Sequence, residues 1–465
     1  MKAGQIEHVV VLMLENRSFD HLLGLLDHPA LPTVLDEPLE NPLEPAKPGS
    51  PRYTAYELDG YEALAADPKH GFPDVMRQLS GHAGPWRSPY TLTNNGFAWN
   101  FHARRGASGA QVLGCYPPKL VPVLSTLARE YGVCTRWFCS VPSETWPNRL
   151  FAHAATSDDL LINKKDLYDD RTVFEALSSA KKSWQIYAGD IPQCSVFSEL
   201  WWHDGGPRFS RLSAFFEHAQ AGRLPNYSFL EPRHFGSAMD SQHPLGKLLL
   251  GERLISSVYQ AITSNREGWN KTVLVITYDE HGGFFDRVPP AAAVPHRAGA
   301  KDPNYGFTFD LLGPRVPAVV VSPWIDALSV HDSVHDHTSI IATLRELFRF
   351  DETLTDRDAA ATGFEALLSR STPSPPIQLP ALPTIRAAEL GPAEWAEGVA
   401  PDGTIQLNDL QQQLVDLALR IEDAQPPPKG PRGVELEAAP EPPFESEAEL
   451  GEFVEAFRRR QLERM

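Results

Sequence analysis

The amino-acid sequence predicts an α/β fold in which a mostly parallel central sheet is sandwiched between helices. Apolar runs rich in Val or Ile occupy residues 9–14, 272–278 and 317–322, and a more mixed run occupies residues 132–140. Consecutive apolar positions suit strands that are covered on both faces, as in parallel sheets. Helical patterns lie between these runs, and such alternation is typical of layered α/β folds.

Three segments carry the helical patterns. Residues 338–348 gather their apolar side chains on one face, and residues 407–421 repeat Leu or Ile at alternating spacings of three and four. Residues 148–155 follow Pro147, which suits the first position of a helix. We expect a helix in each segment.

Proline-rich stretches predict the domain organisation. Residues 36–51 read as a surface loop, residues 373–383 as a linker, and residues 425–443 as a further Pro-rich segment. We therefore expect a main domain over residues 1–370, which would carry the active site. Residues 371–465 would form a Pro-rich linker and a helical C-terminal extension.

Composition excludes several classes of protein. The 465 residues are 42% hydrophobic, which supports a sizeable core. The net charge of −18 argues against nucleic acid as a partner, because phosphate contacts need clustered Lys and Arg. No apolar run approaches the roughly 20 residues of a membrane helix, so we expect no stable membrane insertion. Because no signal peptide is visible, we expect a protein that is cytoplasmic or exported by a non-classical route.

The four cysteines, Cys115, Cys134, Cys139 and Cys194, include no CxxC pair. Neither a zinc ribbon nor a thioredoxin-type site is therefore indicated. A chain of this length does not need disulfides, so we expect buried thiols.

Polar residues directly follow two of the predicted strands. Glu15 and Asn16 follow the strand nearest the N-terminus, and Asp279 and Glu280 follow the strand at 272–278. Ligands of open α/β sheets bind beyond the carboxyl ends of strands, and carboxylate and amide oxygens suit a hard divalent cation. Adjacent carboxylates also repel each other unless a positive charge lies nearby. These residues therefore predict a metal site, with a helix cap and a solvated turn as the alternatives.

A third strand end leads to a hydroxyl residue, Thr145, just before a helix that Pro147 would start. Backbone N–H groups at a helix start favour anions. A hydroxyl there can attack phosphorus if a metal lowers its pKa, and Arg149 could bind a phosphate oxygen in bidentate fashion. The alternative is that Thr145 is an ordinary N-cap. Together with two metal half-sites, this hydroxyl indicates phosphoryl transfer.

Seven short motifs occur in an order that is found in one family. They are residues 15–21 (ENRSFDH), 145–149 (TWPNR), 225–229 (PNYSF), 242–244 (QHP), 278–284 (YDEHGGF), 313–317 (GPRVP) and 336–339 (DHTS). The sequence resembles the bacterial phospholipase C and acid phosphatase family of phosphoesterases, a branch of the alkaline phosphatase superfamily. The resemblance covers about the first 350 residues and implies an alkaline-phosphatase-like sheet between helical layers.

The resemblance also implies roles for single residues. The metal ligands would be Glu15, Asn16, Thr145, Asp279 and Glu280. Thr145 would be the nucleophile and His243 the general acid. His70, with His82 as the second candidate, and Arg149 would bind the substrate. The metal would be a divalent cation whose identity the sequence does not indicate.

Two positions depart from the family pattern. Ser143 and Glu144 stand where the family often has Gly-Pro, which makes Ser143 a rival hydroxyl. Arg287 follows Asp286 where the family often has His. Both departures bear on the choice of substrate more than on the chemistry.

We therefore expect a metal-dependent, phospholipase C-like phosphoester hydrolase that works through a phosphothreonine intermediate. One alternative is an acid phosphatase that acts on soluble phosphomonoesters. Another is a catalytically inactive protein that binds phosphoesters. A sulfatase-like reaction is less favoured, because it generally uses a modified Cys or Ser and Cys139 lies in the strand ahead of the nucleophile position.

Overall fold

The strand that follows the N-terminus lies at the centre of the molecule, because every residue from Val9 to Leu14 is apolar and fully buried. The structure is a computed structural model that describes residues 5–61, 64, 66–163, 167–200, 208–244, 246–384, 398–399, 405–407, 409–423 and 446–463. Within these residues, eight strands form one sheet in the order β12-β6-β11-β10-β1-β9-β7-β8. The strands are β1 (His8–Leu14), β6 (Gly132–Cys134), β7 (Trp184–Ala188), β8 (Phe209–Arg211), β9 (Tyr227–Glu231), β10 (Thr272–Tyr278), β11 (Ala318–Val321) and β12 (Ser329–His331).

The sheet is mostly parallel, as the sequence predicts. β11 alone runs antiparallel to both of its neighbours in this sheet, β10 and β6. The pairs β1–β10, β1–β9, β9–β7, β7–β8 and β12–β6 are parallel. The predicted α/β fold class is therefore confirmed.

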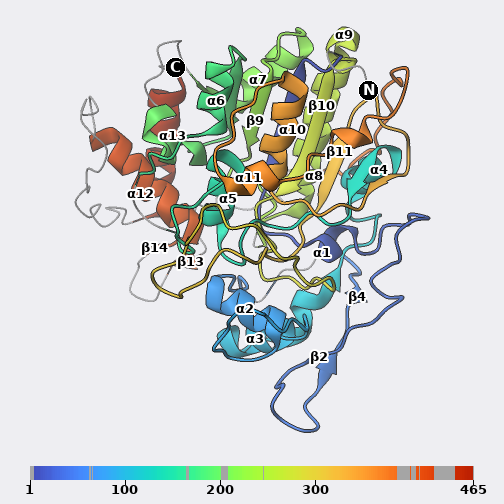
Figure 1. Cartoon of the computed structure of the whole chain (residues 1–465), viewed down its shortest axis with the longest axis vertical. Coiled ribbons are helices and arrows are strands. Elements are labelled where there is room, and N and C mark those ends of the chain that lie inside the picture. Colours follow the sequence, from blue (N-terminus) through green and yellow to red (C-terminus); the bar gives the residue numbers. More distant parts are fainter. Residues whose placement is uncertain are drawn as a thin grey trace.

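Helices cover the sheet in two groups (Figure 1). In one group, α8 (Leu248–Ser264) packs against both α4 (Pro122–Glu130) and α7 (Leu212–Gln220). In the other, α5 (Thr145–Ala154) packs against both α6 (Val173–Ser179) and α10 (Thr338–Phe348). Three short helices are α1 (Phe19–Leu23), α9 (Arg266–Trp269) and α11 (Asp356–Ala360). The helix predicted over residues 338–348 is confirmed with its bounds.

The predicted strand over residues 132–140 is wrong beyond Cys134. Only Gly132–Cys134 forms a strand, and the chain after it makes isolated bridges from Trp137 to His335 and from Phe138 to Arg315. The Arg315 side chain also binds the carbonyl oxygen of Thr135. The mixed composition of this run reflects a loop that is crossed by two other segments.

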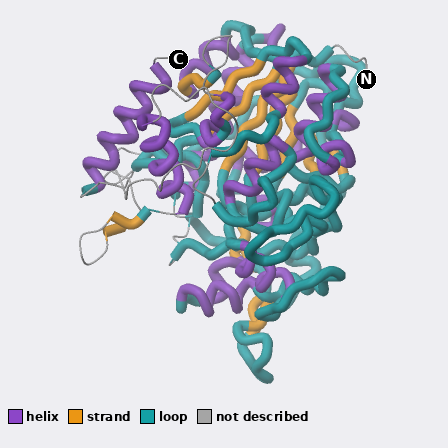
Figure 2. The backbone as a smooth tube through the Cα atoms, turned by 60° about the vertical axis from the view of Figure 1, so that its left-hand side comes forward, coloured by secondary structure: helices purple, strands orange, loops and turns teal. Residues whose placement is uncertain are grey.

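A second, smaller hydrophobic core lies beside the helices α2 (Phe72–Ser80) and α3 (Phe97–Arg105). Phe284, Phe285 and Phe307 join it from loops that follow β10. Figure 1 shows α2 and α3 below the sheet, and Figure 2 shows that loops fill much of the region between them. The loops after the strand ends are therefore held between two cores.

The expected C-terminal extension contains α12 (Asp409–Asp423) and α13 (Glu447–Glu463). The pattern at residues 407–421 predicted the first of these to within two residues at each end. Leu414, Val415 and Phe457 belong to the same core as the sheet. The Pro-rich segment predicted at residues 425–443 lies outside the described residues.

Two further expectations concern cysteines and membranes. All four cysteines are buried free thiols, as predicted. None of the described helices combines the length and the apolar character that crossing a bilayer requires.

Candidate active site

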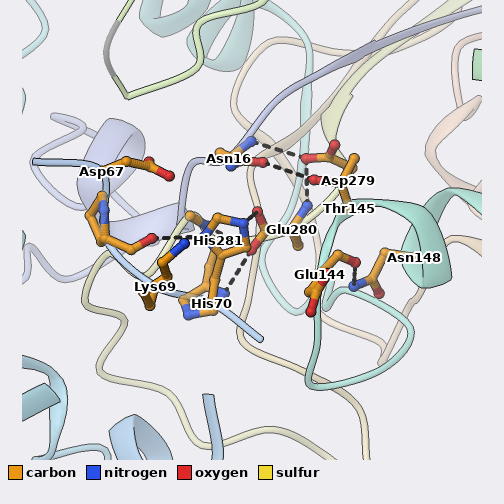
Figure 3. Close-up of polar contacts among 12 residues, drawn as sticks. Asn16, Asp67, Lys69, His70, Glu144, Thr145, Asn148, Asp279, Glu280 and His281 are labelled. Atoms are coloured by element: carbon orange, nitrogen blue, oxygen red, sulfur yellow. Dashed lines mark hydrogen bonds and ion pairs between the residues drawn. The ribbon is translucent and has the colours of Figure 1, made fainter. Parts of the chain in front are cut away.

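The ends of β1 and β10 bring the two acidic pairs together. The strands run parallel with Leu14 opposite Tyr278, so the residues that follow them lie side by side. The backbone N–H of Asn16 donates to Asp279 Oδ1 at 3.0 Å, and the N–H of Glu280 donates to the same oxygen at 2.8 Å. Asn16 therefore shares one hydrogen-bond network with Asp279 and Glu280, although more than 260 positions separate them in the sequence (Figure 3).

A tight glycine turn makes this approach possible. Gly282 has a φ of +62°, and a Cβ placed on it would meet the carbonyl oxygen of Asn16 at 2.3 Å. Asn16 itself has a φ of +57°, a conformation that Asn tolerates better than most residues. The loops after β1 and β10 thus fit against each other only without a side chain at position 282.

The Thr145 hydroxyl reaches this network from α5. It donates to Asn16 Oδ1 at 3.5 Å, a long and weak contact, and the residue is 2% exposed. The helix begins at Thr145 itself, with Glu144 as the N-cap. The expected helix start at residue 148 is therefore wrong, because α5 begins about one turn earlier. The alternative that Thr145 is the N-cap is also wrong, because Glu144 takes that position.

Arg149 lies one turn after Thr145 and points to the same place. Its Nε donates to Asp279 Oδ2 at 2.9 Å, and its Nη2 donates to the carbonyl oxygen of Leu14 at 3.2 Å. Nη1 is buried and has no hydrogen-bond partner among the described residues. A bidentate clasp of phosphate would therefore require Arg149 to leave Asp279, whereas Nη1 alone is ready to donate.

Glu280 and His70 face each other in the interior of the site. His70 Nε2 lies 3.7 Å from Glu280 Oε1, which has no hydrogen-bond partner in the described part of the chain. Burial alone would lower the pKa of His70, but the carboxylates of Glu280 and Asp67 outweigh it and raise that pKa to about 9. Burial raises the pKa of Glu280 to about 8, against the opposing field of His70.

Glu15 is held from the neighbouring strand. His234 Nδ1 lies 3.1 Å from Glu15 Oε2, while Glu15 Oε1 is buried without a hydrogen-bond partner among the residues described. Burial would raise the pKa of Glu15, but nearby groups, above all His243 and His234, lower it to about 2. Glu15 is therefore an anion with one oxygen still available.

His243 approaches from the loop before α8. Its Nε2 lies 3.7 Å from Asp67 Oδ1, and its Nδ1 is buried with no hydrogen-bond partner in the described ranges. Arg17 holds the loop through bonds to the carbonyl oxygens of Gln242 and His243 at 2.7 and 3.3 Å. His243 thus faces the side of the site formed by Asp67 and Glu15.

Comparisons with known proteins identify the family of the chain. The profile of the phosphoesterase family matches residues 6–351. The chain belongs to the phosphoesterase family. As predicted, it is a phosphoric ester hydrolase.

Three curated phosphoesterases illustrate the similarity. Non-specific phospholipase C3 of Arabidopsis thaliana is 36% identical over 443 residues, which cover 90% of this chain and 82% of that protein. Phospholipase C A of Mycobacterium tuberculosis is 28% identical and covers 74% of this chain and 73% of its own length. Non-hemolytic phospholipase C of Pseudomonas aeruginosa is 28% identical over 74% of this chain and 54% of its own length.

One solved structure, a protein of the alkaline phosphatase superfamily from Vibrio parahaemolyticus, superposes with a TM-score of 0.33 at 12% identity. It covers 51% of this chain and 63% of its own. The TM-score is low, and the α/β fold class of this phosphoesterase follows from the strand order and direction of its own sheet.

The rival residues of this phosphoesterase lie in other surroundings. The hydroxyl of Ser143 donates to the carbonyl oxygen of Leu161, and the Cys139 thiol donates to Val141. His82 is exposed. These contacts leave Thr145 as the hydroxyl that faces Asn16.

Two histidines that the sequence left unassigned support the acidic pair. His337 Nε2 donates to the carbonyl oxygen of Asp279 at 2.6 Å, and His281 lies 2.8 Å from Gln78 and 3.2 Å from Glu280. Burial lowers the pKa of both histidines. Both are therefore hydrogen-bonded structural groups.

The two departures from the family pattern have local explanations. The Arg287 guanidinium binds the carbonyl oxygens of Pro32 and Thr33 and so fastens a loop. Glu144 adds to the negative field that raises the pKa of His70, after Glu280 and Asp67.

Sequence reasoning missed His234, Asp67 and Asp190. His234 comes three residues after β9, the other parallel neighbour of β1, and Asp190 comes two residues after β7. Asp190 accepts from the backbone N–H of His234 at 2.7 Å. Extending the strand-end rule to β9 and β7 would have found these two, whereas Asp67 lies in a loop that carries no such signal.

The donors at this site fit a divalent cation. Glu15 Oε1 and Glu280 Oε1 are buried acceptors without hydrogen-bond partners in the part of the chain that is described. Such oxygens are costly to bury unless a cation or a proton lies against them. Carboxylate, amide and hydroxyl oxygens together make a hard-ligand set, as the sequence predicted.

Proposed function

We propose that this phosphoesterase hydrolyses phospholipids in the manner of a phospholipase C, in a metal-dependent reaction with a phosphothreonine intermediate. One observation carries the proposal: the Thr145 hydroxyl faces Asn16 Oδ1, in a network that contains Asp279 and Glu280. The named phospholipases C among the relatives support the substrate class.

Five residues would hold the cation, namely Glu15, Asn16, Thr145, Asp279 and Glu280. When bound there, a divalent cation lowers the pKa of a coordinated hydroxyl and offsets charge on a phosphate oxygen. The orphaned oxygens of Glu15 and Glu280 support this assignment.

The side chains of the protein would perform the remaining tasks. The Thr145 hydroxyl gives up its proton to solvent, and its oxygen attacks phosphorus. The bond to the leaving alkoxide breaks while His243 donates a proton to that alkoxide. Protonated His70 and the free Nη1 of Arg149 bind phosphate oxygens. Water then cleaves the phosphothreonine and restores the hydroxyl.

The deciding experiment replaces the nucleophile. We expect Thr145→Ala to lose about a thousandfold or more in kcat on phosphatidylcholine, because the attacking oxygen is gone. Thr145→Ser keeps the hydroxyl and should retain part of the activity. Acid-quenched turnover of phosphatidylcholine followed by peptide mass spectrometry should find phosphocholine, the headgroup left after the lipid alkoxide departs, on Thr145.

Ser143→Ala is the matched control, because the Ser143 hydroxyl is already bound to Leu161. Wild-type-like turnover by Thr145→Ala would overturn the assignment of the nucleophile. Faster hydrolysis of an aryl phosphate than of phosphatidylcholine, at matched metal, would favour the acid phosphatase instead. Failure to bind or respond to any divalent ion would favour a phosphoester-binding protein without activity.

A further inference from the structure

A thiol and two imidazoles meet at one edge of the sheet. β12 is the edge strand, and it pairs with β6 in parallel so that His331 lies opposite Cys134. His335 follows in the loop before α10. One ligand atom from each of the three residues lies within 4.8 Å of the others. Directly paired residues present their side chains on one face, which explains why residues from distant parts of the chain converge here.

The hydrogen bonds of His335 orient its ring toward this cluster. His335 Nδ1 lies 3.0 Å from the carbonyl oxygen of Thr362, which can only accept, so Nδ1 carries the hydrogen. Nε2 therefore presents a lone pair, and it faces His331 Nδ1 at 2.6 Å. Fixing one ring nitrogen on a backbone carbonyl, with the other nitrogen left to ligate, is the usual arrangement of metal-bound histidines.

Negative charge lies close to the same cluster. Glu365, in the short 3₁₀ helix Glu365–Leu367, and Asp332 both act electrostatically on His331. Glu365 Oε2 is buried and finds no hydrogen-bond partner among the described residues. A cation bound by one thiolate and two neutral imidazoles would keep a positive charge, and these carboxylates would offset it.

We propose that Cys134, His331 and His335 bind a borderline-soft divalent cation of the Zn²⁺ class, at a site built from other residues than the oxygen-lined active site. Thiolate and imidazole are the ligands that zinc prefers, whereas the five residues proposed as ligands in the active site offer oxygens. His331 is half-buried, so water can reach the cation and fill a remaining position.

Binding requires two local changes. Burial raises the pKa of the Cys134 thiol, so the thiol is protonated when no cation is bound. It must therefore give up its proton to solvent when the cation binds. The facing nitrogens of His331 and His335 must also move from 2.6 Å apart to roughly 3.3 Å, the separation that tetrahedral ligation at Zn–N distances of ~2.0–2.1 Å implies. A half-buried side chain on an edge strand can make that shift.

The bound cation would join β12, β6 and the loop that leads into α10. His337 comes two residues after His335 and donates to the carbonyl oxygen of Asp279. The cation would thus fix the segment that supports one of the acidic residues of the active site.

The experiment uses Co²⁺ as a spectroscopic substitute in the full-length, reduced, metal-stripped protein. We expect a near-ultraviolet sulfur-to-cobalt absorption that saturates at one Co²⁺ per chain and that Zn²⁺ abolishes. Cobalt in the active site gives no such absorption, because its ligands there would be oxygens. The two sites are therefore read separately.

Three variants test the assignment. Cys134→Ser should lose the absorption, and His331→Asn should raise the Co²⁺ concentration for half-saturation at least about tenfold. Cys194→Ser is the matched control, because Cys194 is also buried beside a histidine, with Sγ 3.3 Å from His153 Nε2. Since Cys194 is not a proposed ligand, this variant should keep the absorption.

His331→Asn also guards against a folding artefact, because His331 is half-buried and its loss leaves the core intact. If the wild type shows no sulfur-to-cobalt absorption, the proposal is overturned. The contact between His331 and His335 is then an ordinary hydrogen bond. Absorption that persists in Cys134→Ser, or an unchanged affinity in His331→Asn, would overturn it as well.

Discussion

At the scale of single residues, the candidate active site depends on backbone shape as much as on charge. Asn16 and Gly282 both adopt positive φ, and their backbones touch. This contact brings the two strand-end loops together, so that Asn16 can share hydrogen bonds with Asp279 and Glu280. The carboxyl groups then require a cation or a proton nearby, since Glu15 and Glu280 each keep a buried oxygen without a hydrogen-bond partner among the described residues.

The glycine turn yields the first residue-scale prediction. Gly282→Ala should destabilise the fold by at least about 2 kcal/mol and lower kcat at least about tenfold, because the added Cβ meets the carbonyl oxygen of Asn16. Chemical denaturation and turnover assays measure the two effects.

Gly299→Ala is the control for backbone strain alone. Gly299 has a φ of +74°, and a Cβ on it would meet no described atom within 4 Å. We expect a loss of about 1 kcal/mol with full activity. Equal effects of the two substitutions would show that strain, and not the approach to Asn16, sets the cost at position 282.

At the scale of elements, the buried Glu252 joins two helices that cover the sheet. Glu252 lies in α8 and accepts from the first turn of α4, at 2.6 Å from the N–H of Val123 and 3.2 Å from that of Leu124. The residue is completely buried. Burial raises the pKa of Glu252 from 4.5 to about 8, although the two backbone hydrogen bonds oppose the shift.

This raised pKa predicts a pH-dependent stability. The folded protein holds the proton more tightly than the unfolded chain, so the contribution of Glu252 is complete below pH 4.5 and is lost as the pH rises to about 8. Relative to Glu252→Gln, the free energy of unfolding of the wild type should therefore fall by about 2–4 kcal/mol between pH 5 and pH 8.

Urea denaturation at several pH values measures this difference. Glu267→Gln is the control, because Glu267 is 82% exposed and pairs with Lys271 at the surface. Because an exposed ion pair contributes little to stability, this variant should stay close to the wild type in every measurement. A flat difference for Glu252→Gln would mean that the carboxyl stays ionised in the folded protein.

At the scale of the whole molecule, the C-terminal extension reaches the back of the candidate active site. Gln411 of α12 is buried, and its Nε2 donates to the carbonyl oxygen of His234 at 2.9 Å. His234 in turn contacts Glu15. We propose that residues 371–465 form an extension whose helix α12 docks on the main domain and helps to position a metal ligand.

This arrangement predicts a long-range effect on activity. Gln411→Ala should raise the metal concentration for half-maximal activity about three- to tenfold, because His234 and Glu15 lose part of their support. Metal titrations of turnover measure the change.

Gln412→Ala is the control on the same helix, since its side chain binds Asp416 within α12 at 3.0 Å. It should behave as the wild type. Equal behaviour of both variants would mean that α12 contributes only packing.

The sequence by itself determined the strands and helices whose patterns depend on residues near one another in the chain. Strands β1 and β10 were readable because their apolar runs are continuous, and helix α10 because its apolar face repeats. The same local reading located the strand ends, and with them Glu15, Asn16, Asp279 and Glu280.

Only the tertiary structure decided how these groups meet. The contact of Thr145 with Asn16 spans 129 positions and that of His234 with Glu15 spans 219, and no periodic pattern encodes such distances. Burial is also a property of the folded chain alone. Glu15 and Glu280 each keep an oxygen without a hydrogen-bond partner among the described residues, because folding excludes the water that would otherwise bind it. The cluster at Cys134 was unreadable for the same reason, because strand pairing alone places His331 opposite it.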